Sequence, residues 1–386
     1  MKLADSLARL QTETAFEVLA RAAELQRQGK DIINLGIGQP DFKTLEHVVE
    51  AAVKALRDGH HGYTPANGIL ELREAVVADI AARRGAEVSP ENVVIMPGGK
   101  PTMFFSIMMF GAPGVEIMYP DPGFPIYRSM IEYTGAKPVP IVLREENGFA
   151  FSAEELLANI TDKTRLIIVN SPGNPTGGAT PRAEVEKLIA GLADWPDVAV
   201  MSDEIYSRML YGGAKHVSFL EYPEIRDRLI LLDGWSKTYA MTGWRLGYSI
   251  WPDALVEKAT RLCINSHSCV NAPTQFAGIA ALNGPQDAVD EMMVAFDERR
   301  QTIVAALNAL PGFTCLDPAG AFYAFPNISG TGESAKSLQK RFLEEAGVAT
   351  VAGPSFGVHA DDYIRFSYAN SVENIVEAIS RIKAIL

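Results

Sequence analysis

A lysine, an aspartate and an asparagine each follow a short apolar run in this 386-residue chain. Lys237 comes after the run Leu229 to Leu232, Asp203 comes after Val198 to Met201, and Asn174 lies in the turn-like sequence SPGNPTG. A lysine at the end of a buried strand is unusual, because removing an ammonium group from water is costly. Its pKa would be lowered there, and the neutral amine could form a Schiff base with a carbonyl compound. The alternative is an ordinary exposed lysine in a turn.

Asp203 opens the sequence DEIY, which ends in Tyr206. A carboxylate buried at this position could keep a pyridine nitrogen protonated, so that the ring can accept electrons. Tyr206 could donate to a phenolate oxygen of the same ring, and the amide of Asn174 could point at that oxygen from a rigid turn. The alternatives are a helix N-cap or a solvated acid at Asp203, core packing for Tyr206, and a plain tight turn at Asn174.

Gly98, Gly99 and Lys100 connect an apolar run to a helical segment. Glycines let the backbone approach a phosphate, and a helix N-terminus supplies N–H groups and the positive end of a dipole. The segment is not a Walker A loop, because Val94 and Pro101 occupy positions where that motif needs glycine and serine or threonine. It is a candidate anion-binding loop, with a simple left-handed turn as the alternative.

Two arginines are further candidates for anion binding. Arg245 follows Lys237 by eight residues and could bind a phosphate with two parallel hydrogen bonds, although an ordinary surface arginine is the alternative. Arg365 lies in the apolar sequence YIRFSY, where a guanidinium is costly unless an anion pairs with it. That anion is either an internal carboxylate or the carboxylate of a substrate. Taken in chain order, the candidates together meet the needs of one phosphorylated cofactor.

Helical and strand-like segments alternate along the chain, which indicates an α/β fold. Because continuous apolar runs are typical of buried parallel strands, and ligands bind beyond the carboxyl ends of such strands, we expect the candidate residues along one edge of one sheet. Helices are predicted over Leu7 to Gly29, Glu46 to Asp58 and Leu70 to Arg84, and strands over Asn92 to Met96, Val115 to Tyr119, Arg165 to Val169 and the two runs before Asp203 and Lys237.

The length predicts two domains, because 386 residues are too many for one simple core. From about Ala288 onward, long helical patterns replace most of the strand-like runs. We expect a large cofactor-binding domain over residues 48–285, and a small domain built from residues 1–47 and 286–386.

Composition argues against several classes of partner. The net charge of -12 disfavours nucleic acid and anionic membranes. Cys263, Cys269 and Cys315 have no CxxC spacing and are expected to be reduced, which fits a cytoplasmic protein. The six histidines include no metal-ligand pair, so no protein-bound metal is expected.

Residues 1–10 lack the apolar core of a signal peptide, and the most apolar stretch, 102–109, is far shorter than the roughly 20 residues of a membrane span.

Seven segments carry a resemblance to a known family. They are NLGIGQPDF at 34–42, YTPANGILELR at 63–73, NSPGNPTG at 170–177, SDEIY at 202–206, SKTYAMTGWRLGY at 236–248, GAFY at 320–323 and IRFSYA at 364–369. With them the chain resembles the class I aminotransferases of the aspartate aminotransferase-like fold over nearly its whole length. The resemblance implies the fold of pyridoxal-phosphate-dependent transferases (fold type I), with a mostly parallel central sheet flanked by helices in the large domain and a smaller α+β domain.

The resemblance also implies a role for each candidate residue. Lys237 would hold pyridoxal 5′-phosphate as a Schiff base and shuttle the proton. Asp203 would pair with the pyridine nitrogen, while Tyr206 and Asn174 would contact the phenolate oxygen. The residues that would hold the phosphate region are Gly98, Gly99, Lys100, Ser236 and Arg245.

Four other positions follow from the same resemblance. Phe124 would stack on the cofactor ring, and Gly38 and Arg365, together with Asn174, would bind the α-carboxylate of the substrate. Tyr63 would reach the phosphate of the neighbouring subunit, so the active unit is expected to be a homodimer.

The implied activity is a ping-pong transfer of an amino group from an L-amino acid to a 2-oxo acid. No clear second arginine is present for a distal carboxylate, although Lys100 could serve in that role. Phe16, Met103, Phe104 and Phe105 could favour an apolar substrate side chain or could simply pack in the core.

A β-lyase or decarboxylase on the same scaffold is the alternative reaction. A non-catalytic amino-acid sensor is less consistent with the sequence, because such regulators carry an added DNA-binding module and no extra N-terminal region is expected here.

Overall fold

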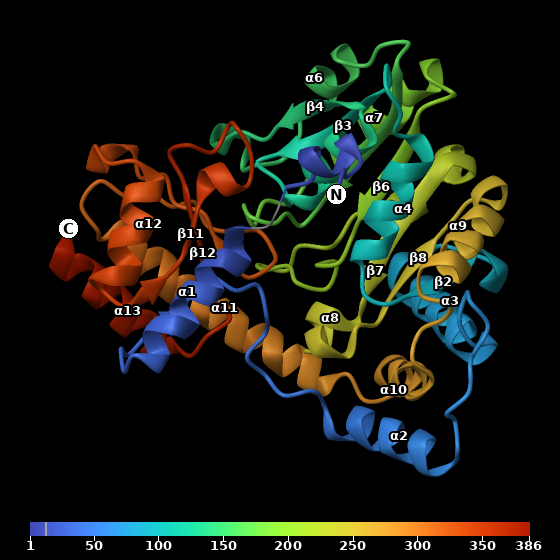
Figure 1. The fold of residues 1–386 in the computed structure, drawn as a ribbon, viewed down its shortest axis with the longest axis horizontal. Coiled ribbons are helices and arrows are strands. Elements are labelled where there is room, and N and C mark those ends of the chain that lie inside the picture. The colour runs from blue at the N-terminus through green and yellow to red at the C-terminus, as the bar shows by residue number, and fades with distance from the viewer. Residues whose placement is uncertain (12–13) are drawn as a thin grey trace.

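The computed structural model describes residues 1–11 and 14–386, and of residues 14 and 15 it describes the backbone only. In this part of the chain the central element is a seven-stranded sheet with the order β2-β8-β7-β6-β5-β3-β4 (Figure 1). Its strands are β2 (Val93–Met96), β3 (Glu116–Asp121), β4 (Lys137–Val142), β5 (Thr164–Asn170), β6 (Ala199–Asp203), β7 (Leu229–Gly234) and β8 (Gly247–Ile250). The mostly parallel central sheet predicted from the sequence is confirmed.

The direction of the strands brings the ends of all five predicted runs to one edge. Neighbouring strands from β4 to β7 are parallel. Strand β8 is antiparallel to both β7 and β2, so β2 points the same way as the parallel group. The segments that follow β2, β3, β5, β6 and β7 therefore lie at the same edge of the sheet, as expected.

Helices cover both faces of the sheet, because its strands are apolar on both sides. Alternate residues of a strand point to opposite faces, so Ile168 of β5 packs with one layer and Ile167 with the other. The first layer contains α4 (Lys100–Phe110), α5 (Ile126–Thr134) and α9 (Asp253–Ser266). The second contains α3 (Leu70–Arg84), α6 (Ala153–Ala158), α7 (Arg182–Gly191) and α10 (Ala272–Asn283), and α2 (Glu46–Arg57) packs on α10.

A second part of the molecule lies beside this sheet (Figure 1). Its antiparallel sheet has the order β11-β12-β9, and β1 pairs in parallel with β10. The strands are β1 (Ile33–Asn34), β9 (Tyr323–Ala324), β10 (Val348–Ala349), β11 (Val351–Ala352) and β12 (Ile364–Ser367), and the helices are α1 (Thr14–Arg27), α11 (Asp287–Asn308), α12 (Ala335–Glu344) and α13 (Val372–Ile385). The domain boundaries at residues 47/48 and 285/286 stay a prediction.

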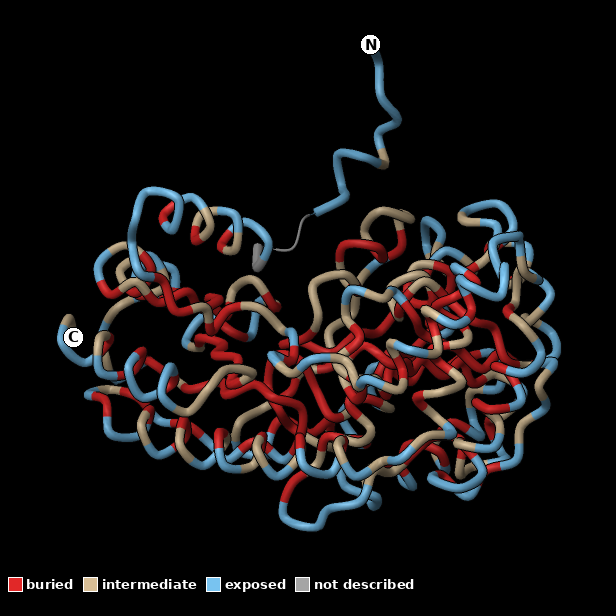
Figure 2. Tube along the Cα trace, turned by 90° about the horizontal axis from the view of Figure 1, so that it is seen from below, coloured by how far each residue is buried: buried red, intermediate tan, exposed pale blue. Residues whose placement is uncertain are grey.

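The single helix predicted over Leu7 to Gly29 is wrong. The described residues form a 3-10 helix, Asp5–Arg9, and the separate helix α1, while residues 12 and 13 lie outside the described part. Leu10 is extended, and both backbone groups of Gln11 hydrogen-bond to the Ser129 hydroxyl on α5, at 2.9 and 3.2 Å. The backbone is therefore satisfied by a distant helix. Figure 2 shows the first residues of the chain as an exposed segment that projects from the body.

Two strands of the main sheet were not predicted from the sequence. Strand β4 contains Pro138 and Pro140, which have no backbone N–H to donate to a neighbouring strand. These prolines are tolerated because β4 lies at the edge of the sheet. Strand β8 begins at Gly247, where a side chain would overlap the backbone of Gly98. This close approach places the loop after β2 directly against β8.

Other structural features bear on location and chemistry. No helix of the described residues is long and apolar enough to cross a bilayer. Within the same residues the three cysteines are free, and no group of three or more histidine, cysteine, aspartate or glutamate side chains is arranged to hold a metal ion. The cytoplasmic location stays a prediction.

A buried ionic network behind β6 and β7 gives a test of the packing. Arg84 lies 3.1 Å from the carboxylate of Glu204 and also contacts Asp233, and all three side chains are buried. Replacing Arg84 by methionine leaves two buried carboxylates without this cation, and we expect a loss of about 3–5 kcal/mol in the free energy of unfolding. Urea denaturation measures it. The control Lys54→Met removes an exposed ion pair with Asp58 and should cost about 0–1 kcal/mol; equal effects of the two variants would refute the assigned role of the network.

Candidate active site

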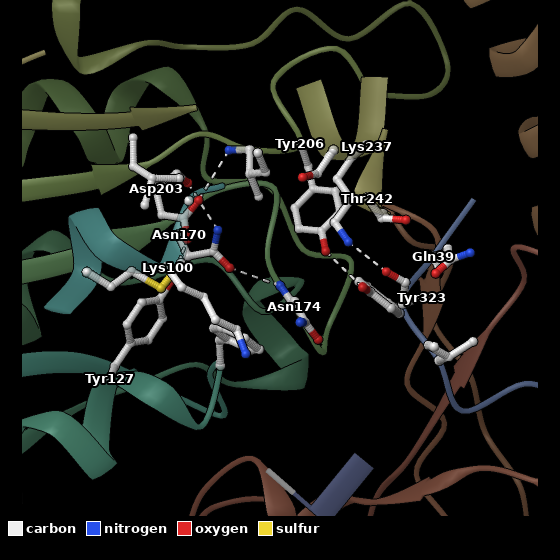
Figure 3. Close-up of a pocket in the computed structure, with 18 of the residues that line it drawn as sticks. Gln39, Lys100, Tyr127, Asn170, Asn174, Asp203, Tyr206, Lys237, Thr242 and Tyr323 are labelled. Atoms are coloured by element: carbon white, nitrogen blue, oxygen red, sulfur yellow. Dashed lines mark hydrogen bonds between the residues drawn. The ribbon is translucent and has the colours of Figure 1, made fainter. Parts of the chain in front are cut away.

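A cavity of about 490 Å³ opens at the carboxyl edge of the main sheet and extends to the second part of the molecule (Figure 3). Helix α1, the loop after β1, and strands β9 and β12 contribute its far wall. Its lining residues are Phe16, Leu19, Ile37, Gly38, Gln39, Gly99, Lys100, Met103, Phe124, Tyr127, Asn170, Asn174, Asp203, Ile205, Tyr206, Leu232, Ser236, Lys237, Thr242, Arg245, Tyr323 and Arg365. Most of the candidates chosen from the sequence are thus brought together.

Lys237 lies on α8 (Trp235–Thr238), the single turn that follows β7. Its ammonium group donates a hydrogen bond of 2.6 Å to the carbonyl oxygen of Gly38. Burial, together with the positive charges of Arg365 and Arg245, lowers the pKa of Lys237 to about 7, while Asp203 acts in the opposite direction. A substantial fraction of the amine is therefore neutral near pH 7, which is the form that acts as a nucleophile or a base.

Asp203 ends β6 and faces the same cavity. Its carboxylate accepts hydrogen bonds from the Tyr127 hydroxyl at 2.6 Å and from the backbone N–H of Ile205 at 3.2 Å. Burial raises the pKa of Asp203 to about 7, and the two hydrogen bonds oppose that rise. Tyr127 was not selected from the sequence, and its only signal was its position shortly after the DPGF segment.

A pair of tyrosines connects the two sides of the cavity. The hydroxyl groups of Tyr206 and Tyr323 lie 2.8 Å apart (Figure 3). A side chain at Gly38 would overlap the Tyr323 hydroxyl, so only glycine allows this approach. Tyr323 was quoted from the sequence within GAFY without a role. The contact of Tyr206 with a phenolate oxygen stays a prediction, since its hydroxyl is here paired with Tyr323.

Arg365 is held from several directions on β12. Its Nη1 donates to the side-chain oxygen of Asn174 at 2.8 Å, and its Nη2 donates to the carbonyl of Gly36. The guanidinium carbon lies 4.6 Å from the ring centre of Tyr323 and 4.8 Å from that of Phe356, within the range of cation–π contacts. A planar, oriented guanidinium in a cavity is suited to bind a carboxylate bidentately.

The part of the cavity wall formed by Arg245 and the start of α4 is suited to an anion. Arg245 has a positive φ of 54° and donates to the carbonyl of Thr242 at 2.7 Å. Gly98 does not line the cavity, but a side chain there would overlap the Arg245 guanidinium. Gly99 and Lys100 begin helix α4, whose N–H groups and dipole favour negative charge. This geometry is compatible with the predicted phosphate contacts, which stay a prediction.

The remaining candidates are divided between the cavity and other places. Phe124 and Ser236 line the cavity, whereas Tyr63 is 93% exposed and does not. Of the four apolar candidates, Phe16 and Met103 line the cavity, while Phe105 is buried in the core beneath α4 and Phe104 packs against that core. Cavity residues that were not selected from the sequence, besides the two tyrosines, are Leu19, Ile37, Gln39, Asn170, Ile205, Leu232 and Thr242.

The lowered pKa of Lys237 can be measured by chemical labelling. Cyanate reacts with neutral amines, so we expect carbamylation of Lys237 in the cofactor-free protein to rise with pH and to be half-maximal near pH 7. Peptide mass spectrometry after brief labelling between about pH 5 and about pH 9 gives the profile. Lys187 is the control, because its pKa is raised above 10.5 by a hydrogen bond from its ammonium group to Glu184. Parallel profiles for the two lysines would show that Lys237 is not perturbed.

Comparison with known proteins adds an independent finding. Residues 30–382 match the family model for aminotransferase class I and II. The chain is 36% identical to an aspartate aminotransferase of Bacillus subtilis, covering 99% of this chain and 98% of that protein. It is 40% identical to an aspartate aminotransferase of Pyrococcus horikoshii, with 96% and 93% covered. The solved aspartate aminotransferase from Thermus thermophilus with maleate aligns with a TM-score of 0.94 at 34% identity, covering 100% of both chains.

Proposed function

This chain belongs to the class I and II aminotransferase family, and from that premise we propose that it transfers amino groups between L-amino acids and 2-oxo acids with pyridoxal 5′-phosphate bound at Lys237. The observation that carries the proposal is the buried amine of Lys237, whose pKa of about 7 suits a nucleophile and a base at neutral pH. Members of the family use this cofactor. Both substrates share an α-carboxylate, for which Arg365 is the proposed partner.

The residues around Lys237 fit pyridoxal phosphate by their chemistry. An anion-binding end formed by Arg245, Ser236 and the start of α4 suits the phosphate group. The buried carboxylate of Asp203 suits a protonated pyridine nitrogen, and Phe124 supplies an aromatic face. When bound, the cofactor would supply an aldehyde that takes up the amino group and a ring that stores the electrons of the broken Cα–H bond.

The chain itself would bind the substrate and move the proton. The Arg365 guanidinium binds the substrate α-carboxylate, and Asn174 keeps the guanidinium oriented through its 2.8 Å hydrogen bond. The neutral Nζ of Lys237 takes the proton from the substrate Cα and later returns it as an ammonium group. The Gly38 carbonyl accepts a hydrogen bond of 2.6 Å from Nζ and so holds the amine beside the loop that follows β1.

We also propose a homodimer as the active unit. Tyr63 is 93% exposed and lies outside the cavity of its own chain, which suits a contact with the phosphate region of a partner. Other large apolar side chains are exposed as well, among them Leu70, Met108 and Ile264, each at least 46% exposed. Burial of such side chains favours association.

The substrates are proposed from the relatives and from the lining. The relatives compared above are named aspartate aminotransferases, and one was solved with the dicarboxylate maleate. Lys100 lies on the cavity wall and is the proposed cation for a distal carboxylate, with its Nζ 5.3 Å from the ring centre of Phe16 and 5.5 Å from that of Phe124. Dicarboxylic amino acids are therefore the first donors to test, and apolar ones the second, because Phe16 and Met103 share the wall.

The proposal is tested by adding a panel of amino acids to protein loaded with pyridoxal phosphate. We expect the absorbance of the bound cofactor to change to that of its amino form with aspartate or glutamate, and to return on addition of a 2-oxo acid. Lys237→Ala should retain the cofactor, and its rate of transamination should fall about 10²–10⁴-fold, because the group that carries the proton is gone.

Two outcomes would contradict this account. If Lys237→Ala transaminates at the normal rate, the assignment of the base is wrong. If products such as pyruvate accumulate without any 2-oxo acid acceptor, the reaction is that of a β-lyase.

A further inference from the structure

Asp121, the last residue of β3, is completely buried and accepts hydrogen bonds from another part of the chain. Its two carboxylate oxygens accept the backbone N–H groups of Val358 and His359, each at 3.2 Å. The Tyr119 hydroxyl donates to the same carboxylate at 3.3 Å, and the His359 ring nitrogen lies 3.5 Å from it. An aspartate at the edge of the main sheet thus holds a loop that is more than 230 residues away in sequence.

Residues 356–359 pack closely against the carboxylate of Asp121. Gly357 has φ +148°, and a side chain at this position would overlap Asp121 Oδ1. A second backbone contact supports the first, because the N–H of Gly123 donates to the carbonyl of Phe356 at 2.8 Å. Together these contacts tie residues 356–359 to the end of β3.

The same loop contacts the guanidinium of Arg365. It joins β11 to β12, and Arg365 lies on β12. The ring centre of Phe356, the residue next to the pinned glycine, lies 4.8 Å from the guanidinium carbon of Arg365. A displacement of the loop would therefore move both the ring that packs on Arg365 and the strand that carries it.

We propose that Asp121 is a positioning residue for substrate binding: by fixing residues 356–359 it sets the orientation of Arg365 and hence the affinity for the α-carboxylate. The inference rests on the proposed function of Arg365 as the carboxylate ligand. Asp121 does not line the cavity and would touch neither substrate nor cofactor. Its effect would be common to all amino acid substrates, because all carry the same α-carboxylate.

Asp121→Asn tests the proposal, because it preserves size, removes the negative charge and replaces one of the two acceptor oxygens by an NH2 group that cannot accept an N–H. We expect the KM of each active amino acid to rise about 10-fold, while kcat changes by less than about threefold, since hydrogen bonds to a charged group are among the stronger ones. The Kd of maleate for the holoenzyme should rise by a similar factor. Gly357→Ala, which displaces the loop without changing the main sheet, should give the same pattern.

A double-mutant cycle separates positioning from a general loss of structure. In the Arg365→Lys background, Asp121→Asn should raise KM by no more than about twofold further, because the guanidinium that it orients is already gone. Glu116→Gln is the matched control: Glu116 is a buried carboxylate at the other end of the same strand, bonded to Lys137 and Thr161. It should lower stability and leave KM unchanged.

The outcomes are distinguishable from failure of the proposed function. If the wild-type protein does not transaminate any amino acid, the proposed function fails. If the wild type is active and Asp121→Asn leaves KM and the Kd of maleate unchanged, the positioning role is refuted. A rise of KM in Asp121→Asn that is equally large with Arg365 present or replaced by lysine would also refute it.

Discussion

The proposed transamination depends on the desolvation of one ammonium group. Lys237 is enclosed at the end of β7, with the positive charges of Arg365 and Arg245 nearby and Asp203 acting against them. Because charge is penalised there, the lysine is close to half neutral at physiological pH. Holding the charged ammonium group in this site lowers the free energy of unfolding. This destabilisation is complete below about pH 7 and declines as the pH rises from about 7 towards 10.5, where the unfolded chain also loses its proton.

The fold makes this arrangement possible by bringing strand ends together. Parallel strands place Asn170, Asp203 and the turn that carries Lys237 at one edge of the sheet. The second part of the molecule then covers that edge with Gly38, Tyr323 and Arg365. Burial of Lys237 therefore requires both parts, because its hydrogen-bond acceptor, Gly38, belongs to the segment before α2. The contact of Asp121 with residues 358 and 359 is a second connection of this kind.

Local patterns were sufficient to predict the residues at the ends of the strands. The apolar runs of β5, β6 and β7 are bounded by turn residues, so the sequence alone assigns Asn174, Asp203 and Lys237 to one edge. Residues whose place depends on distant contacts could not be predicted. Tyr127 is 76 residues from Asp203, and the Tyr323 hydroxyl meets that of Tyr206 across 117 residues.

The same distinction explains the errors in secondary structure. After Arg9 the backbone of Gln11 is hydrogen-bonded to the Ser129 hydroxyl of α5, a contact that the helical periodicity of residues 7–29 could not reveal. Strand β4 contains two prolines, which are tolerated because the strand lies at the sheet edge, where the missing donors are not needed by a further strand. The apolar side chains of β5, β6 and β7 were enough to predict these strands, whereas the break after Arg9 and the prolines of β4 involve contacts and positions in the fold that local sequence does not show.

Covalent trapping tests the central claim most directly. The protein is loaded with pyridoxal phosphate, reduced with borohydride, digested and analysed by peptide mass spectrometry. The account predicts the phosphopyridoxyl mass on Lys237. A label on Lys100 instead, which lines the same cavity, or the absence of any stable label after reduction, would contradict it.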